Sequence, residues 1–349
     1  MNGRSHIPSL DGIRALAALW VFAVHAHLLR GVPGGFGVTV FFFLSGYLIT
    51  TLLRVEYEKT GDISLRKFYL RRVYRILPPM YIVMALAYGL WLIDALPGQP
   101  TGGAIAAQIA HLTNYFMVFN GEKHIIPSTG LMWSLAVEEH FYLIYPVALL
   151  LLLRHLPYRD IVWILLAVCF VVMLWRTYMT THAPGVGDYT YVATDARIDS
   201  LLYGCILGLW CNPAVDTQRL SANAWLWTGV LAVATAVLIF TFEYHTATSD
   251  GFTYSLQGLA LVPFFYCAIQ FNRWPAFSWL ELRPVRAMGI ISYTFYLIHL
   301  PILHVLRYLM PHKRYEWLMA LPLAIAFAIG MYVLVERPLA ERRRKLHRI

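Results

Sequence analysis

Long apolar stretches decide what this chain can fold into. A helix of about twenty apolar residues crosses the roughly 30 Å of hydrocarbon in a bilayer, and many segments of the chain come close to that length. With 59% hydrophobic and only 13% charged residues, the composition also lies outside the range of soluble domains. We therefore predict an all-α integral membrane protein, a bundle of about ten transmembrane helices forming one domain over 1–349. The predicted spans are 8–30, 36–53, 76–95, 131–153, 161–178, 196–211, 223–242, 254–271, 288–309 and 316–335.

One further apolar stretch, 104–119, is shorter and contains Gln108, His111 and Asn114. We predict that it forms a short re-entrant or interfacial helix. Lys and Arg in short loops accumulate on the cytoplasmic side, and ten spans place most basic residues, including the loop 54–75 and the basic tail, on one side. An eleventh span would separate that loop from the tail. The charges thus predict a multi-pass protein of the cell (inner) membrane with both termini cytoplasmic.

The net charge of +9 follows from this topology. Basic residues next to spans contact anionic lipid headgroups, so membrane lipid is the expected partner of these residues and nucleic acid is not. The cysteines show no metal-ligand spacing, and no metal site is expected.

Two ionisable residues lie within the first span. Burying such a side chain in lipid costs at least about 2.5–3.5 kcal/mol on insertion scales, so it usually faces the bundle interior and marks function. Arg14 and His25 are eleven residues apart, close to three helical turns, and therefore share one face about 16 Å apart. With the N-terminus inside, Arg14 offers an anion site near the cytoplasm and His25 a proton-transfer group farther out.

The span 131–153 repeats this pattern. Ser134, Glu138, Tyr142 and Tyr145 follow helical spacing on one polar and aromatic face. The neighbouring His140 points elsewhere, so we do not interpret it as a second catalytic histidine.

The segment "RRVYRILPPMY" places Arg72 and Arg75 one turn apart at the mouth of a span, before Pro78 and Pro79. Arginines in this position either extend to lipid headgroups or bind a phosphate-rich ligand bidentately. In "FFFLSGYLIT", Ser45 and Gly46 are typical of close helix packing.

Two later segments also carry polar residues into or beside spans. The stretch "ATDARIDSLLYG" places Asp195, Arg197 and Asp199 at the outer mouth of a span, and "ISYTFYLIHLPI" places His299 within another.

In this order, these motifs resemble the membrane-bound acyltransferase 3 family, whose members acylate sugars and other acceptors of the cell envelope. The family's motif of arginine, ten residues and histidine matches Arg14 and His25. "FFFLSGYLIT", "RRVYRILPPMY", "WSLAVEEHFYLIYP", "SYTFYLIHLP" and the late "ERP" match further family segments. His140 stands where relatives often carry glutamine, and the extracytoplasmic hydrolase-like domain of some members is not expected here.

The resemblance implies an O-acyltransferase that moves an acyl group from cytoplasmic acyl-CoA to a hydroxyl of an envelope carbohydrate, glycolipid or similar acceptor. Acetyl, and hence acetyl-CoA, is the default by family frequency, with no permanently bound cofactor. His25 is the expected general base, with Glu138 orienting it or balancing its charge, and Arg14, on the same helix face, is the third expected catalytic residue. Arg14, Arg72 and Arg75 are expected to bind the phosphates of acyl-CoA, with Ser45, Tyr142 or Ser134 donating to the thioester oxygen.

Two alternatives stay open at this level. His25 could carry the acyl group transiently instead of only removing a proton. The chain could also be a proton-coupled transporter or flippase that uses buried charges as a relay, although no internal repeat of the kind common in such transporters is visible. Assembly as a homo-oligomer is compatible with either activity.

Overall fold

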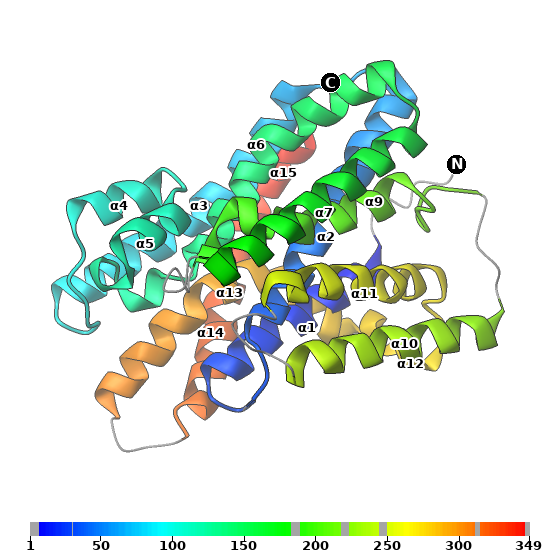
Figure 1. Ribbon diagram of the computed structural model, residues 1–349. Coiled ribbons are helices and arrows are strands. Elements are labelled where there is room, and N and C mark those ends of the chain that lie inside the picture. Colours follow the sequence, from blue (N-terminus) through cyan, green and yellow to red (C-terminus); the bar gives the residue numbers. More distant parts are fainter. Residues whose placement is uncertain are drawn as a thin grey trace. The chain divides into compact units, whose positions relative to one another are not determined.

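Helices form every regular element of this protein that the structure describes (Figure 1). The computed structural model describes residues 7–29, 31–182, 189–217, 223–243, 250–310 and 315–345, and the all-α prediction is confirmed for them. The two chain ends, for which the basic residues predict a cytoplasmic location, lie outside these ranges.

The helices fall into two compact units, each described here by itself. Three helices have residues in both units, namely α1 (Pro8–His25), α6 (Met132–His155) and α13 (Arg283–Leu309). The first unit also contains α2 (Gly35–Thr60), α7 (Tyr158–His182), α8 (Tyr189–Val192), α9 (Thr194–Leu209), α10 (Ala224–Glu243), α11 (Asp250–Gln270), α12 (Pro275–Ser278) and η3 (Trp279–Glu281). The second contains α3 (Leu65–Leu92), α4 (Gly102–Ile109), α5 (Thr113–Asn120), η1 (Glu122–His124), η2 (Pro127–Thr129), α14 (Trp317–Met331), the π-helical η4 (Tyr332–Glu336) and α15 (Arg337–Lys345).

Eight helical segments among the described residues are long and apolar enough to cross a membrane. They correspond to eight of the ten predicted spans, and the chain is an all-α membrane protein. The remaining two predicted spans form α1, which carries Asp11 and Arg14, and α9, which has 16 residues. The eight segments are Gly35–Thr60, Leu65–Leu92, Pro127–His155, Tyr158–His182, Ala224–Glu243, Gly251–Gln270, Arg283–Leu309 and Trp317–Arg342.

Most of the segment 54–75, predicted to be a basic loop, is helical, so the loop is much shorter than predicted. Helix α2 continues to Thr60 and ends where Gly61 adopts φ 74° and donates its N–H to the Tyr57 carbonyl at 2.8 Å. Helix α3 begins at Leu65, so only 61–64 connect the two. Arginine and lysine have high helix propensity, so basic residues do not by themselves interrupt a helix.

The stretch 104–119 forms two helices instead of the one predicted. Helices α4 and α5 have eight residues each, about 12 Å, too short to cross the hydrocarbon. His111 separates them with φ 56°. Buried Gln108 is held by hydrogen bonds with the hydroxyls of Tyr88 and Thr129, each 2.8 Å.

Glycines allow α2 and α9 to pack backbone against backbone in the first unit. A Cβ at Gly46 would lie 1.9 Å from the Leu201 carbonyl oxygen, and one at Gly204 would lie 2.0 Å from the Phe43 carbonyl oxygen. Small residues permit this close approach between helices in membranes. The packing role predicted for Gly46 is confirmed.

A buried ion pair joins α7, α9 and α11 in the same unit. Arg176 and Asp199 are both 0% exposed and meet bidentately at 3.1 and 2.9 Å. The other donors of the Arg176 guanidinium bind the Ala196 carbonyl, the Gly251 carbonyl at 2.8 Å and the Ser255 hydroxyl at 2.8 Å. All five N–H groups of the arginine are therefore satisfied.

The predicted outer mouth around Asp195 is mostly buried. Arg197 and Asp199 are fully buried, and Asp195 is half-buried. The Arg197 guanidinium lies 3.6 Å from the centre of the Tyr254 ring and donates to the Thr39 hydroxyl at 3.0 Å. It also donates to the Tyr191 carbonyl at 3.2 Å, and the aromatic face and these two hydrogen bonds compensate for the loss of water around the cation.

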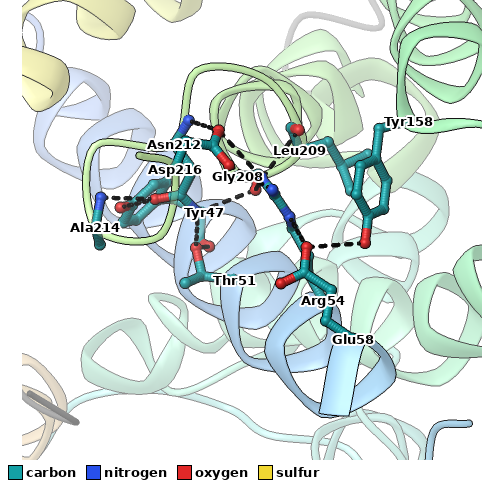
Figure 2. A network of polar contacts seen from close by, with 10 residues as sticks. All are labelled: Tyr47, Thr51, Arg54, Glu58, Tyr158, Gly208, Leu209, Asn212, Ala214 and Asp216. Carbon is teal, nitrogen blue, oxygen red and sulfur yellow. Dashed lines mark hydrogen bonds and ion pairs between the residues drawn. The ribbon is translucent and has the colours of Figure 1, made fainter. Parts of the chain in front are cut away.

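A second polar network attaches the segment after α9 to α2 (Figure 2). Arg54 donates to Glu58 at 2.8 Å and forms an ion pair with Asp216. The Asn212 side chain accepts from the Tyr47 hydroxyl at 2.7 Å. Arg54, predicted to start a basic loop, is instead 7% exposed within α2, because Asp216 neutralises it there.

Candidate active site

His25 is the last residue of α1, not a residue within a longer helix as predicted. His27 follows in the left-handed conformation, with φ 57°. The Leu28 N–H bonds to the Ala23 carbonyl at 2.8 Å, and the His27 N–H bonds to the Val24 carbonyl at 3.0 Å. This pair of bonds is the Schellman motif, which ends a helix and reverses the chain. The imidazole thus stands at a well-defined helix end.

The side chain of His25 pairs with His299 of α13, in the second unit. His25 Nδ1 lies 2.9 Å from His299 Nε2, and the rings are nearly parallel with an interplanar angle of 22°. His299 Nδ1 lies 2.6 Å from the Tyr296 carbonyl oxygen. His299 is 1% exposed and packs against Phe22 and Phe295, while His25 is half-buried. Of the two imidazoles, only that of His25, the outer ring of the pair, is accessible.

Arg307, two turns beyond His299 on α13, holds the main chain of the same residue. Its guanidinium donates to the His25 carbonyl at 2.6 Å and pairs with Glu316 at 3.1 Å. The last carbonyls of a helix have no partner within it, and a cation there also opposes the negative end of the helix dipole. Helix α13 therefore fixes both the ring and the backbone of His25.

His299 is the partner of His25 that sequence reasoning missed. Its segment "SYTFYLIHLP" was recognised, and a histidine within a span was the available signal. The hydrogen bond on His25 Nδ1 goes to His299, and the role predicted for Glu138 in orienting His25 stays a prediction. Helical phase relates residues of one helix, and the pair spans 274 positions of sequence, so no periodicity could have found it.

The first unit brings together Ser45, Glu138 and Tyr142, as the polar face of 131–153 suggested. The Ser45 hydroxyl donates to Glu138 Oε1 at 2.7 Å. The Tyr142 hydroxyl lies 3.0 Å from Glu138 Oε2 and 3.1 Å from Ser45 Oγ. One turn on, Tyr145 and Thr50 share a hydrogen bond of 2.8 Å. The carboxylate of Glu138 is therefore surrounded by hydroxyl donors from α2 and α6.

We expect Tyr142→Phe to lower the free energy of unfolding by about 1.5–3 kcal/mol, the usual size for a hydrogen bond to a charged group. In a Glu138→Gln background the same change should cost only about 0.5–1.5 kcal/mol, as for a neutral pair. A double-mutant cycle of unfolding in detergent measures the difference. Tyr57→Phe is the matched control, because the Tyr57 hydroxyl donates to the neutral Leu153 carbonyl at 3.0 Å. Equal costs of Tyr142→Phe in both backgrounds would contradict an ionised Glu138.

Ser134 belongs to a different cluster from Glu138. Its hydroxyl donates to the Leu131 carbonyl at 3.0 Å and lies 2.8 Å from the Tyr296 hydroxyl. The Tyr296 hydroxyl also lies 3.4 Å from the Leu131 carbonyl, so either hydroxyl of the pair can be the donor. Of the three predicted oxyanion donors, Ser134 is thus engaged in closing the first turn of α6.

Two of the three predicted phosphate-binding arginines, Arg14 and Arg72, have local partners of their own. Arg14 pairs with Asp11 at 3.4 Å, and its side chain is 18% exposed. Arg72 stacks over Phe68 at 5.6 Å from the ring centre. Arg72 and Arg75 are half-buried one turn apart within α3, which continues through Pro78. They lie well inside a helix and not in a loop.

Two smaller predictions can be compared with the structure. His140 Nδ1 lies 2.7 Å from the Thr194 hydroxyl and thus points toward α9, away from the Ser45 and Glu138 pair. Across the described ranges, no group of three His, Cys, Asp or Glu residues is arranged to hold a metal ion.

Comparison with known proteins assigns the class. Residues 7–336 match the acyltransferase 3 profile, described as an acyltransferase domain. The chain therefore belongs to the acyltransferase 3 family, whose enzymes transfer groups other than aminoacyl groups, and the predicted resemblance is confirmed.

Its curated relatives include peptidoglycan O-acetyltransferase OatA of Listeria monocytogenes, 32% identical over 86% of this chain and 50% of the relative. O-acetyltransferase OatA of Staphylococcus aureus is 30% identical over 87% of this chain and 51% of its own length. The putative peptidoglycan O-acetyltransferase YrhL of Bacillus subtilis is 31% identical over 85% and 49%. The chain spans about half the length of these relatives. No solved structure matches it.

Proposed function

We propose that this chain transfers an acyl group, acetyl by default, from acyl-CoA at the cytoplasmic face of the cell membrane to a hydroxyl of an envelope carbohydrate. Peptidoglycan is the first acceptor to test, because it is the acceptor named for the relatives. The observation that carries the proposal is the His25 imidazole, half-buried at a helix end and held by His299 and Arg307. Such a group is placed to exchange one proton repeatedly at fixed geometry.

The chemistry requires little beyond this base. A thioester is already activated, so the acceptor hydroxyl attacks its carbonyl carbon while His25 removes the hydroxyl proton. The new C–O bond forms and the C–S bond breaks. The imidazolium then returns the proton to the departing thiolate, so the enzyme ends in its starting state. General base catalysis of this kind contributes about 10²–10⁴-fold.

Charged groups on the cytoplasmic side are proposed to bind the donor. Arg72 and Arg75, one turn apart on α3, suit the phosphates of coenzyme A, because guanidinium groups bind phosphate bidentately. The same role for Arg14 stays a prediction from its place in the motif. A location in the inner membrane with both termini cytoplasmic belongs to this proposal.

The direct test measures coenzyme A release from acetyl-CoA by the purified protein, with soluble peptidoglycan fragments as acceptor. We expect His25→Ala to lower kcat by about 10²–10⁴-fold, while His155→Ala, at the end of α6, leaves it unchanged. Mass spectrometry of envelope glycans from cells with the gene, without it and with His25→Ala checks the acceptor. If no acyl donor yields coenzyme A while the protein still moves a substrate across vesicles, a transporter replaces the enzyme.

A transient acyl-His25 is a second route through the same residue. Incubation with radiolabelled acetyl-CoA and no acceptor should then yield labelled protein that is lost in His25→Ala. Kinetics that require a ternary complex, without labelled protein, would leave His25 as a base only.

A further inference from the structure

We propose that His299 is a positioning residue that fixes the tautomer of His25, so that Nε2 of His25 is the atom that removes the acceptor proton. This inference rests on the proposed function. It adds a residue that the motif of Arg14 and His25 does not contain, and it names the reacting nitrogen of His25.

The assignment starts from the Tyr296 carbonyl, which can only accept a hydrogen bond. His299 Nδ1, 2.6 Å away, must therefore carry a proton and donate it. A neutral imidazole has one donor nitrogen and one acceptor nitrogen, so Nε2 of His299 is an acceptor. The Tyr296 backbone thus sets the tautomer of the buried ring.

The same logic passes to the outer ring. His25 Nδ1 lies 2.9 Å from the acceptor nitrogen of His299, so Nδ1 of His25 carries the proton. The remaining nitrogen, Nε2, holds a lone pair, and no hydrogen bond to it occurs among the described residues. For two neutral imidazoles, this is the only placement of protons that satisfies both hydrogen bonds. Hydrogen bonds thus connect the Tyr296 carbonyl, His299 and His25 in series, and they leave Nε2 of His25 as the basic atom.

The surroundings keep this arrangement in place. Phe22 and Phe295 pack against the His299 ring, which limits its rotation, and Arg307 binds the His25 carbonyl at 2.6 Å. A histidine whose second nitrogen has a fixed partner keeps its tautomer and orientation. Partners of this type around metal-bound histidines are worth about 10–100-fold when removed.

The first experiment compares two amides at position 299. In His299→Gln the amide oxygen reaches about as far as Nε2 and can accept from His25, whereas in His299→Asn it is too short. We expect His299→Asn to lower kcat for acetyl-CoA and peptidoglycan fragments by about 10–100-fold with KM within twofold. His299→Gln should recover most of kcat. His155→Gln, an exposed histidine at the end of α6, should leave kcat within twofold.

A purely structural role would impair both amides equally and reduce the amount of folded protein. Equal kcat for His299→Asn and His299→Gln at equal folded yield would therefore overturn the proposal, as would a wild-type kcat for His299→Asn.

A second experiment does not depend on turnover. Nitrogen NMR of ¹⁵N-histidine-labelled protein in lipid bilayers reports which nitrogen of each ring is protonated, with His25→Gln and His299→Gln assigning the signals. We expect protonated Nδ1 on both rings. Protonated Nε2 on His25 would overturn the proposal, even if the enzyme is active. If the enzyme is inactive but Nδ1 is protonated on both rings, the proposed function fails and the pairing of the rings stands.

Discussion

Replacing Arg176 with methionine is expected to lower the free energy of unfolding by about 3–5 kcal/mol. The change removes the cation and leaves the Asp199 carboxylate, 0% exposed, without an opposite charge in a site that water does not reach. It also removes the donors that join Gly251 of α11 and Ala196 of α9 to α7. Unfolding in mixed SDS and detergent micelles measures the loss.

The control is an ion pair of the same chemistry in water. Arg154 and Asp62 lie 3.1 Å apart with side chains 51% and 62% exposed, and Arg154→Met should cost no more than about 1 kcal/mol. The double variant Arg176→Met with Asp199→Leu should recover part of the loss, because no uncompensated charge remains. If Arg176→Met costs no more than Arg154→Met, the buried pair does not hold the three helices together.

Replacing Gly204 with alanine is expected to destabilise the protein by about 3 kcal/mol or more, at or beyond the upper end for overpacked cores. The added Cβ would lie 2.0 Å from the Phe43 carbonyl oxygen and 2.8 Å from the Tyr47 nitrogen. Both are backbone atoms of α2, so no side-chain rotation relieves the overlap. Helices α2 and α9 must separate, which also loosens the surface of α2 that presents Ser45.

Gly229 supplies the matched control, because it lies inside α10 with no atom within 4 Å of an added Cβ. Gly229→Ala should raise stability by roughly 0.5–1 kcal/mol, since alanine favours helix over glycine. The two substitutions are chemically identical, so opposite signs isolate the steric effect. If Gly204→Ala lowered the free energy of unfolding by less than about 1 kcal/mol, helices α2 and α9 would accommodate the added methyl group, and the expected overlap would be contradicted. Thermal unfolding of both variants in one detergent makes the comparison.

Hydropathy predicted most of the fold because lipid leaves the backbone few choices. Every N–H and C=O in the hydrocarbon must bond within the chain, so long apolar segments become helices. The ends of helices were harder to predict. Gly61 ends α2 only after a charged last turn, and His27 ends α1 before the apolar stretch is over. Helix ends depend on capping contacts, which hydropathy does not register.

Helical phase predicted part of the candidate site. It placed Glu138 and Tyr142 on one face, and that face meets Ser45 of α2. It also placed Ser134 there, although the Ser134 hydroxyl pairs with Tyr296 of α13. Helical phase shows which residues share a face, but a long helix such as α6 contacts different helices at different points along that face.

The sequence by itself determined the class of this protein, the apolar helices and the motif that contains Arg14 and His25. These follow from local composition and short spacings, whose physical basis is the helical period and the cost of polar groups in lipid. Only the tertiary structure decided that His299 and Arg307 hold His25, and that Arg176 meets Asp199. Such contacts join distant segments through side-chain packing, and no period of a single helix encodes them.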